Sequence, residues 1–413
     1  MKRFGIAGCR AAFDRALAFG FWLLASASLL LPSSCNKLPV GYDQVRDRVT
    51  GTADTTLRPD SASSYARYVP LGGSSMLYLG RDTGYVSRLI LRFSFVDTMS
   101  LDSVTSFQLV LHQLDTLKTM SFICRPCSSE WEESGVSWQM SDSSNHWLTP
   151  GGDFLNDTLA TGTMAHDSTM FDFRYVGLDS ALQATIRTCG VGIFPQDTGI
   201  VAIYSGASTA TAPRLRVTYT KKGKQTTRVI NDVADASLID TVATHSQPFD
   251  LLVGSGLAFR TWLFFNIASI PREATIARAD LKFRPETKYH RSDTFLLGVS
   301  RMTESFRQKD VNARFESLPS SVVSYAVPAD SDSVITIDIK SVVQQWVNYP
   351  ESLWTNHLPP DTLRPSDTLR NNGLIITSSP EWSKLFRLRI PGSGPSAPRL
   401  DIQYVLPPED RFR

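Results

Sequence analysis

The residue types able to carry chemistry in this 413-residue chain are five cysteines, six histidines and an aromatic set that includes eight tryptophans. Cys124 and Cys127 have the two-residue spacing of a redox dithiol. Such a site needs a helix N-terminus that lowers the thiol pKa. The apolar residues before this pair predict a strand, and the serines after it predict a loop. We therefore expect a strand-end disulfide or unreactive thiols, and pairing among Cys124, Cys127 and Cys189 stays open.

The patterns of metal sites and catalytic centres are scarce in the sequence. The six histidines are scattered without the spacing of a metal-binding pair, and the chain has no Gly-x-Ser-x-Gly elbow or phosphate-binding loop. Asp330 and Asp332 form one Asp-x-Asp pair, which could contribute to a structural Ca²⁺ site. We predict no other cofactor and no catalytic residues, so the sequence does not predict an enzyme.

Carbohydrate binding leaves a different pattern, because exposed aromatic rings stack on the apolar faces of sugars. Trp147, which lies among polar residues and glycines, is expected to be exposed. Trp262 is assigned to packing between sheets or domains. A second interpretation stays open, in which these tryptophans pack their own loops or close the end of a sandwich. The candidate carbohydrate-binding residues are Trp138, Trp147, Tyr349, Trp354, Arg364 and Trp382.

The N-terminal segment has the pattern of an export signal. Four basic residues precede an uncharged apolar run over residues 16–31. This run is shorter than the roughly 20 residues that span a bilayer comfortably. Leu-Pro-Ser-Ser before Cys35 resembles the lipobox of bacterial lipoproteins, in which the cysteine is lipidated and becomes the new N-terminus. We expect residues 1–34 to be a signal peptide of this type and residues 35–48 to be a linker; ordinary signal cleavage is the alternative.

The net charge argues against nucleic acid as a partner. The chain has 42 Lys+Arg and 40 Asp+Glu, a net charge of +2. Residues 1–34 carry four basic and one acidic side chain, so their removal changes the net charge from +2 to −1. No basic excess remains that could displace the counterions of a phosphate backbone.

The chain contains two copies of one pattern. Residues 88–95 align with residues 260–267, which lie 172 positions later, and residues 212–219 align with residues 397–404. The segment Thr-Ala-Asp at residue 52 likewise matches Val-Ala-Asp at residue 233. We therefore predict one domain over residues 49–220 and a second over residues 226–405, joined by a short polar link.

Both copies alternate apolar and polar residues with period two, which is typical of half-buried strands. Leu89, Leu91 and Phe93 fall on one face of such a strand. Turn residues recur at short intervals, and the best helical pattern is a short one near residues 341–347. The sequence therefore predicts an all-β protein of two tandem jelly-roll β-sandwich domains.

Two blocks of residues carry a resemblance to a known family. The first is Trp-Glu-Glu-Ser-Gly-Val-Ser-Trp over residues 131–138, and the second combines Trp346 with Asn-Gly-Leu-Ile-Ile over residues 372–376. This pattern resembles the DNRLRE domain family, also called carbohydrate-binding module family 96. The resemblance implies extracellular jelly-roll domains that bind polysaccharide. Each copy keeps a different half of the pattern.

The two copies differ in length at two places. From Phe93 to Asp172 the first copy is six residues longer than its counterpart, and between Asp338 and Gly373 the second is 17 longer. The second insert holds Tyr349, Trp354 and Arg364; binding residues commonly lie on such loops. We expect an exported, membrane-anchored lipoprotein of the cell envelope or surface, or otherwise a secreted protein. Its expected partner is polysaccharide, with membrane contact only through the lipid. The alternative is a structural or adhesive surface protein whose tandem sandwiches act as spacers or protein-binding modules.

Overall fold

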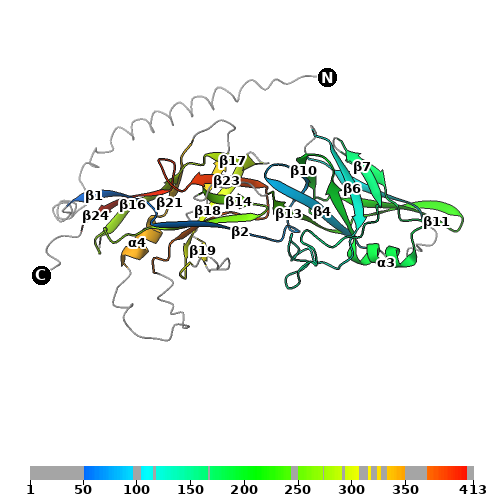
Figure 1. Cartoon of the computed structure of the whole chain (residues 1–413), viewed down its shortest axis with the longest axis horizontal. Helices are drawn as coiled ribbons and strands as arrows, with labels where there is room; N and C mark the ends of the chain where they lie inside the picture. Colours follow the sequence, from blue (N-terminus) through cyan, green and yellow to red (C-terminus); the bar gives the residue numbers. More distant parts are fainter. Residues whose placement is uncertain are drawn as a thin grey trace, which may run out of the picture. The chain divides into compact units, whose positions relative to one another are not determined.

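A computed structural model of the chain is shown in Figure 1. It describes residues 51–95, 104–114, 118–165, 168–242, 250–272, 274–290, 294–306, 315–317, 323–326, 333–348 and 370–406. Residues Ala53–Tyr404 form one compact unit. The expected all-β class is confirmed: antiparallel strands dominate, and the described residues contain two short helices, α3 (Ser180–Cys189) and α4 (Lys340–Asn348). Neither helix has the length and apolar run needed to cross a bilayer.

The first sandwich packs a larger antiparallel sheet against a smaller one. In spatial order, the larger sheet of the described residues contains β10 (Gly199–Tyr204), β3 (Met76–Arg81), β4 (Tyr85–Phe93), β9 (Val191–Pro195), β6 (Met120–Pro126) and β7 (Ala160–Met164), and β13 (Val233–Thr241) also pairs with β4. The smaller sheet contains β12 (Lys224–Ile230), β11 (Arg214–Lys221), β5 (Val104–His112) and β8 (Ser168–Asp172).

The second sandwich has the same two-layer plan. Its larger described sheet contains β17 (Thr287–His290), β23 (Phe386–Pro391), β14 (Asp250–Ser255), β15 (Ala258–Phe264), β22 (Leu374–Ser378), β18 (Thr294–Met302) and β19 (Phe315–Ser317). Two further strands pair with it, β2 (Ser61–Arg67) with β15 and β20 (Val323–Ala326) with β18. The smaller sheet contains β1 (Thr52–Leu57), β24 (Arg399–Val405), β16 (Thr275–Phe283) and β21 (Ile335–Asp338).

The strand orders of the two sandwiches correspond. The series β10-β3-β4-β9-β6 matches β23-β14-β15-β22-β18, and β11-β5-β8 matches β24-β16-β21. In each sandwich one helix connects matching strands along the chain: α3 follows β8 and precedes β9, and α4 follows β21 and precedes β22. The duplication in the sequence is thus repeated in the topology.

Each sandwich has its own apolar core between its two sheets. In the first, Leu89 and Leu91 of β4 pack in one cluster with Val217 of the smaller sheet. In the second, Leu263 of β15 packs in one cluster with Leu281 of β16. All five side chains are at most 1% exposed. Burial of a side chain of this size contributes about 1.5–3 kcal/mol, so the period-two pattern is what holds the sheets together.

The first two strands of the chain pair with the second sandwich. Strand β1 joins β24, and β2 runs antiparallel to β15 with Ser64 opposite Thr261. Conversely, β12 begins inside the predicted link at residues 221–225 and β13 follows that link, but both pair with the first sandwich, β12 with β11 and β13 with β4. Strand pairing therefore crosses the division drawn from the sequence repeat. Figure 1 shows the blue strand β1 beside the red strand β24.

A serine in each crossing strand makes the same hydrogen bond. The N–H of Leu252 on β14 donates to Oγ of Ser64 at 2.7 Å, and the N–H of Tyr78 on β3 donates to Oγ of Ser237 at 2.7 Å. Ser237 is 1% exposed. A buried N–H without an acceptor is costly. Ser64 therefore links β2 to β14 of the second sandwich, and Ser237 links β13 to β3 of the first.

Replacing Ser237 by alanine should lower the free energy of unfolding by about 1–3 kcal/mol, because the buried N–H of Tyr78 loses its acceptor. Urea unfolding of the variant against the parent protein measures this difference. Ser61→Ala, at an exposed serine of β2, is the matched control and should change stability by less than about 0.5 kcal/mol. Equal effects of the two changes would contradict the role given to Ser237.

A buried cluster joins the two sandwiches where the chain crosses between them. Tyr85 of β4 and Ile239 of β13 pack there in one cluster with Phe259 and Leu385 of the second sandwich. The hydroxyl of Tyr85 donates to the carbonyl of Phe386 at 3.3 Å. Because Tyr85 is fully buried, the two sandwiches share apolar surface as well as strands.

Asp235 places a buried carboxyl on the crossing strand β13. It is 1% exposed, and its Oδ2 accepts the N–H of Gly206. Burial raises the pKa of Asp235 to about 7, the Gly206 N–H opposes this rise, and the nearby carboxylate of Glu133 adds to it. The N–H of Asp235 itself donates to Oε1 of Glu133 at 3.5 Å. Ionising Asp235 in the folded protein is therefore unfavourable.

The stability of the protein should fall as the pH rises from about 4 to about 7. In the unfolded chain Asp235 releases its proton near pH 3.9, whereas in the folded chain it holds the proton to about pH 7. The native state thus binds more protons across this window, and the free energy of unfolding decreases there by about 4 kcal/mol at most. Asp235→Asn should remove this part of the slope in urea unfolding at pH 5 to 8. An unchanged slope would contradict the assignment.

Candidate functional site

Two of the predicted sugar-binding tryptophans are buried. Trp138 is 8% and Trp147 is 5% exposed, so the expectation that Trp147 is exposed is wrong. Both pack with Ile90 of β4 and Leu238 of β13 on the outer face of the larger sheet. The indole N–H of Trp147 donates to the carbonyl of Ser137 at 2.9 Å. These rings pack within the loop region after β6, as in the alternative interpretation that the tryptophans pack their own loops. Because both rings are buried, neither presents a free face on which a sugar could stack.

The other predicted residues have mixed positions. Trp382 lies between β22 and β23, is 49% exposed and does not line the cavity described below. The candidate sugar-binding residues Tyr349, Trp354 and Arg364, the lipidation candidate Cys35 and the Ca²⁺ candidates Asp330 and Asp332 lie outside the described residues. Among the described residues, no group of three His, Cys, Asp or Glu side chains is placed to hold a metal ion.

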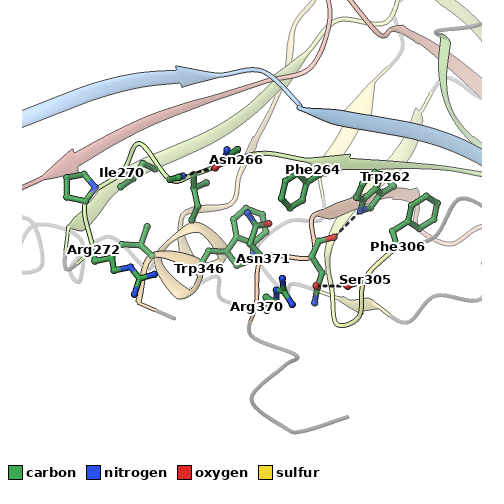
Figure 2. Close-up of a pocket in the computed structure, with 15 residues that line it drawn as sticks. Trp262, Phe264, Asn266, Ile270, Arg272, Ser305, Phe306, Trp346, Arg370 and Asn371 are labelled. Carbon is green, nitrogen blue, oxygen red and sulfur yellow. Dashed lines mark hydrogen bonds between the residues drawn. The ribbon is translucent and has the colours of Figure 1, made fainter. Parts of the chain in front are cut away.

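A cavity of about 670 Å³ opens in the second sandwich (Figure 2). Fifteen described residues line it. They come from the end of β15 and the segment after it, from residues 305–306, from the last turns of α4 and from residues 370–372 before β22. Its volume lies within the range of about 300–1,000 Å³ that is typical of small-ligand sites. We call it the β15–α4 cavity.

Aromatic rings form one side of the β15–α4 cavity. Trp262 of β15 stacks on Phe306, with ring centroids 4.8 Å apart and planes at 25°. Phe264, two residues further along the strand, lies 6.3 Å from the Trp262 ring at 26°. The indole N–H of Trp262 donates to the carbonyl of Asn372 at 3.0 Å. Figure 2 shows these three rings gathered at one end of the cavity.

Trp262 is not among the residues predicted to bind sugar, yet it lines this cavity. Strand alternation places it on the face opposite Leu263, where it packs in a small cluster with Met302 and Ile375 of its own sheet. It therefore combines packing with a position on the cavity wall. A comparison of the two copies could have indicated its role, because the first copy has Ile90 at the matching position and the second has a tryptophan.

Polar groups of the β15–α4 cavity include amides, guanidinium groups and the hydroxyl of Ser305. Asn371 is fixed in place: its Nδ2 donates to the carbonyl of Phe265 at 2.8 Å, and its Oδ1 accepts the N–H of Gly373 at 3.2 Å. Arg272 and Arg370 also line the cavity, and none of the fifteen lining residues is acidic. The described lining therefore contains basic but no acidic side chains beside an aromatic surface.

Trp346 of α4 adds an unsatisfied donor to this wall. Its side chain is 4% exposed, and its Nε1 has no hydrogen-bond partner among the described residues. A buried N–H without an acceptor costs about 1–3 kcal/mol. Trp346 lines the cavity, so an acceptor on a bound molecule or a water would remove this cost.

The first sandwich has a hollow of about 540 Å³ at the matching position. It lies between the end of β4 and the last turn of α3, where Arg92 takes the place of Phe264. Arg92 donates to the carbonyl of Trp131 at 2.9 Å and lies over its ring. Arg187 and Glu130 complete a charged lining. The two copies therefore keep the hollow, but the stacked rings of Trp262, Phe264 and Phe306 are not repeated in the copy-1 lining, whose aromatic residues are Phe93 and Phe95.

No family model and no curated protein that was compared with this chain matches it. The geometry of the described residues therefore carries the functional argument.

The three described cysteines are buried free thiols. Burial raises the pKa of all three, and that of Cys127 reaches about 12. Cys127 also donates through its Sγ to the carbonyl of Ser129 at 3.2 Å. Of the two alternatives left by the sequence, the structure has unreactive thiols rather than a disulfide.

In a full-length chain with Cys9 and Cys35 replaced by serine, the remaining three cysteines should not react with a thiol reagent such as DTNB at pH 8 while the protein is folded. Buried thiols with raised pKa values supply almost no thiolate. In denaturant the same sample should release about three equivalents. Rapid reaction of Cys127 in the native protein would contradict its burial, and release of one equivalent after denaturation would indicate a disulfide.

Proposed function

We propose that this chain is an exported, lipid-anchored protein whose second sandwich binds polysaccharide without cleaving it. The observation that carries the proposal is the β15–α4 cavity, which combines stacked aromatic rings with fixed amides and guanidinium groups. Sugar rings have apolar C–H faces and polar hydroxyl edges. A wall that combines the rings of Trp262 and Phe306 with the fixed amide of Asn371 suits both parts of such a ligand.

The position of the copy-2 insert supports this site. The chain has 25 residues between α4 and β22 but one residue, Gly190, between α3 and β9, and residues 349–369 of the longer connection hold Tyr349, Trp354 and Arg364. Residues on either side of that segment line the β15–α4 cavity, Trp346 and Val347 before it and Arg370 after it. The insert therefore starts and ends at the cavity, which is the place where additional binding residues have most effect.

The export part of the proposal is supported by the sequence. The basic and apolar pattern of residues 1–34 suits a signal peptide, and Cys35 suits a lipid attachment site. The resemblance to carbohydrate-binding module family 96 agrees with the all-β fold, since that family is expected to have jelly-roll domains. It supports polysaccharide as the partner class.

A structural or adhesive role is the second candidate. The buried cluster around Tyr85 and the crossing strands favour it, because they join the two sandwiches through apolar surface and backbone pairing. A unit joined in this way suits a stiff spacer at a cell surface. In that case the aromatic wall of the cavity would have a packing role only.

Replacing Trp262 by alanine should weaken glycan binding about tenfold or more, because loss of an aromatic contact removes roughly 1.5–3 kcal/mol. Retention of the mature chain on a panel of neutral and acidic glycans, soluble and insoluble, measures this. Trp382→Ala removes an exposed ring outside the cavity and should leave binding unchanged.

Thermal unfolding of both variants separates lost binding from lost stability, since Trp262 also packs against Met302. If the parent protein were retained on no glycan, the polysaccharide proposal would be refuted in favour of the spacer role. Equal loss of binding in the Trp262 and Trp382 variants would move the site away from the β15–α4 cavity.

A further inference from the structure

The two copies place an arginine at the same position of the matching strands, but only one of them has a carboxylate partner. Arg260 of β15 corresponds to Arg88 of β4, 172 residues earlier. Arg260 donates through Nε and Nη2 to the two carboxylate oxygens of Glu381, each at 2.7 Å. The side chains are 6% and 14% exposed, so this is a buried bidentate ion pair.

Arg88 has no carboxylate partner among the described residues. Its Nη1 donates to the carbonyl of Gly151 at 3.0 Å, and its guanidinium lies 4.8 Å from the ring of Trp138 and 5.1 Å from that of Phe194. These contacts fix the group in position but leave its charge uncompensated. Burial lowers the pKa of Arg88, and the charge of Arg125 lowers it further.

Arg125 of β6 brings a second positive charge to the same place. Its guanidinium lies 5.3 Å from the ring of Phe194, which Arg88 also contacts. The Nε of Arg125 is buried and has no hydrogen-bond partner in the described part of the chain. Two like charges on one ring repel each other. Among the described residues no carboxylate pairs with Arg88 or Arg125, whereas Glu381 pairs with Arg260 in the second sandwich.

A hollow of about 440 Å³ lies beside these groups. Arg81, Arg88, Arg125 and Phe194 line it together with the loop between β9 and β10. That loop corresponds to the loop between β22 and β23, which supplies Glu381 in the second sandwich. We call this hollow the arginine cavity.

The loop between β9 and β10 does not replace Glu381 in the described contacts. Asp197 is the one acidic residue among the described lining residues of the arginine cavity. Its Oδ2 accepts the N–H of Ser121 at 2.7 Å, and bonding to Ser121 lowers its pKa. Thr198, the next residue, has no charge. The copy-1 loop thus leaves the arginine pair without an internal carboxylate.

We propose that the arginine cavity binds the carboxylate group of a ligand, which takes the place that the Glu381 carboxylate has beside Arg260. Guanidinium groups bind planar carboxylates through two parallel hydrogen bonds, and a pair of them on a rigid aromatic support is preorganised for this. The site lies in the first sandwich and does not rest on the β15–α4 cavity or on polysaccharide binding.

Acetate is the probe that tests the carboxylate site. The mature chain, labelled with ¹⁵N at arginine Nε, is titrated with sodium acetate at constant ionic strength maintained by sodium chloride. The Nε–H signals of Arg88 and Arg125 should shift and saturate, and the signal of Arg260, whose partner is Glu381, should not. The same titration with sodium sulfate distinguishes a tetrahedral anion from a carboxylate.

Thr198→Glu supplies an internal carboxylate to the arginine cavity and should raise the apparent Kd for acetate at least tenfold, with the Arg88 signal shifted before acetate is added. Thr198→Gln is the matched control and should bind acetate as the parent protein does. Arg125→Gln should also weaken binding tenfold or more, whereas Arg174→Gln, at an exposed arginine of the same sandwich, should not. Thermal unfolding confirms that each variant is folded.

Four results would overturn the proposal. The first is the absence of a saturable shift at Arg88 and Arg125, and the second is an equal shift at Arg260. The third is a response to sulfate without a response to acetate, which would exclude the carboxylate class. Unchanged acetate binding in Thr198→Glu would likewise contradict the place assigned to the ligand.

Discussion

The backbone groups along β4, β11, β15 and β24 must all find partners, and this requirement fixes how the two copies are joined. The chain satisfies it by pairing β1 and β2 with the second sandwich and β12 and β13 with the first. The serines Ser64 and Ser237 repeat one hydrogen bond at both crossings. Because a sheet without its neighbouring strand exposes unpaired N–H and C=O groups, neither sandwich is complete without residues from beyond its own stretch of sequence.

This shared frame leaves the surface positions free to differ between copies. Where the second copy has Trp262 and Phe264, the first has Ile90 and Arg92. Arg260 forms an ion pair with Glu381, whereas the matching Arg88 lies near the positive charge of Arg125. Both differences occur on strands whose core-facing residues correspond. The buried face is therefore kept in both copies, whereas the outer face carries two different cavities, one with an aromatic wall and one lined by arginines.

The sequence predicts those features that depend on local pattern. Alternation places Leu89 and Leu91 in the core, and the helical pattern near residues 341–347 corresponds to α4. It does not predict which strands pair, because alternation specifies the buried face of a strand but not its neighbour. Nor does it predict side-chain exposure in long loops. Trp147 has polar neighbours in sequence and is nevertheless buried on Ile90 and Leu238, whereas Trp262 reads as packing and also lines a cavity.

The claim on which the account depends is that β2 is an integral strand of the second sandwich. Native-state hydrogen exchange tests it directly, because amides in one cooperative unit open together. The hydrogen-bonded amides of Ser61–Arg67 should exchange with the same protection as those of Ala258–Phe264, to which they are paired. Fast exchange along β2 while β15 stays protected would contradict this pairing and would show that β2 is not an integral strand of the second sandwich.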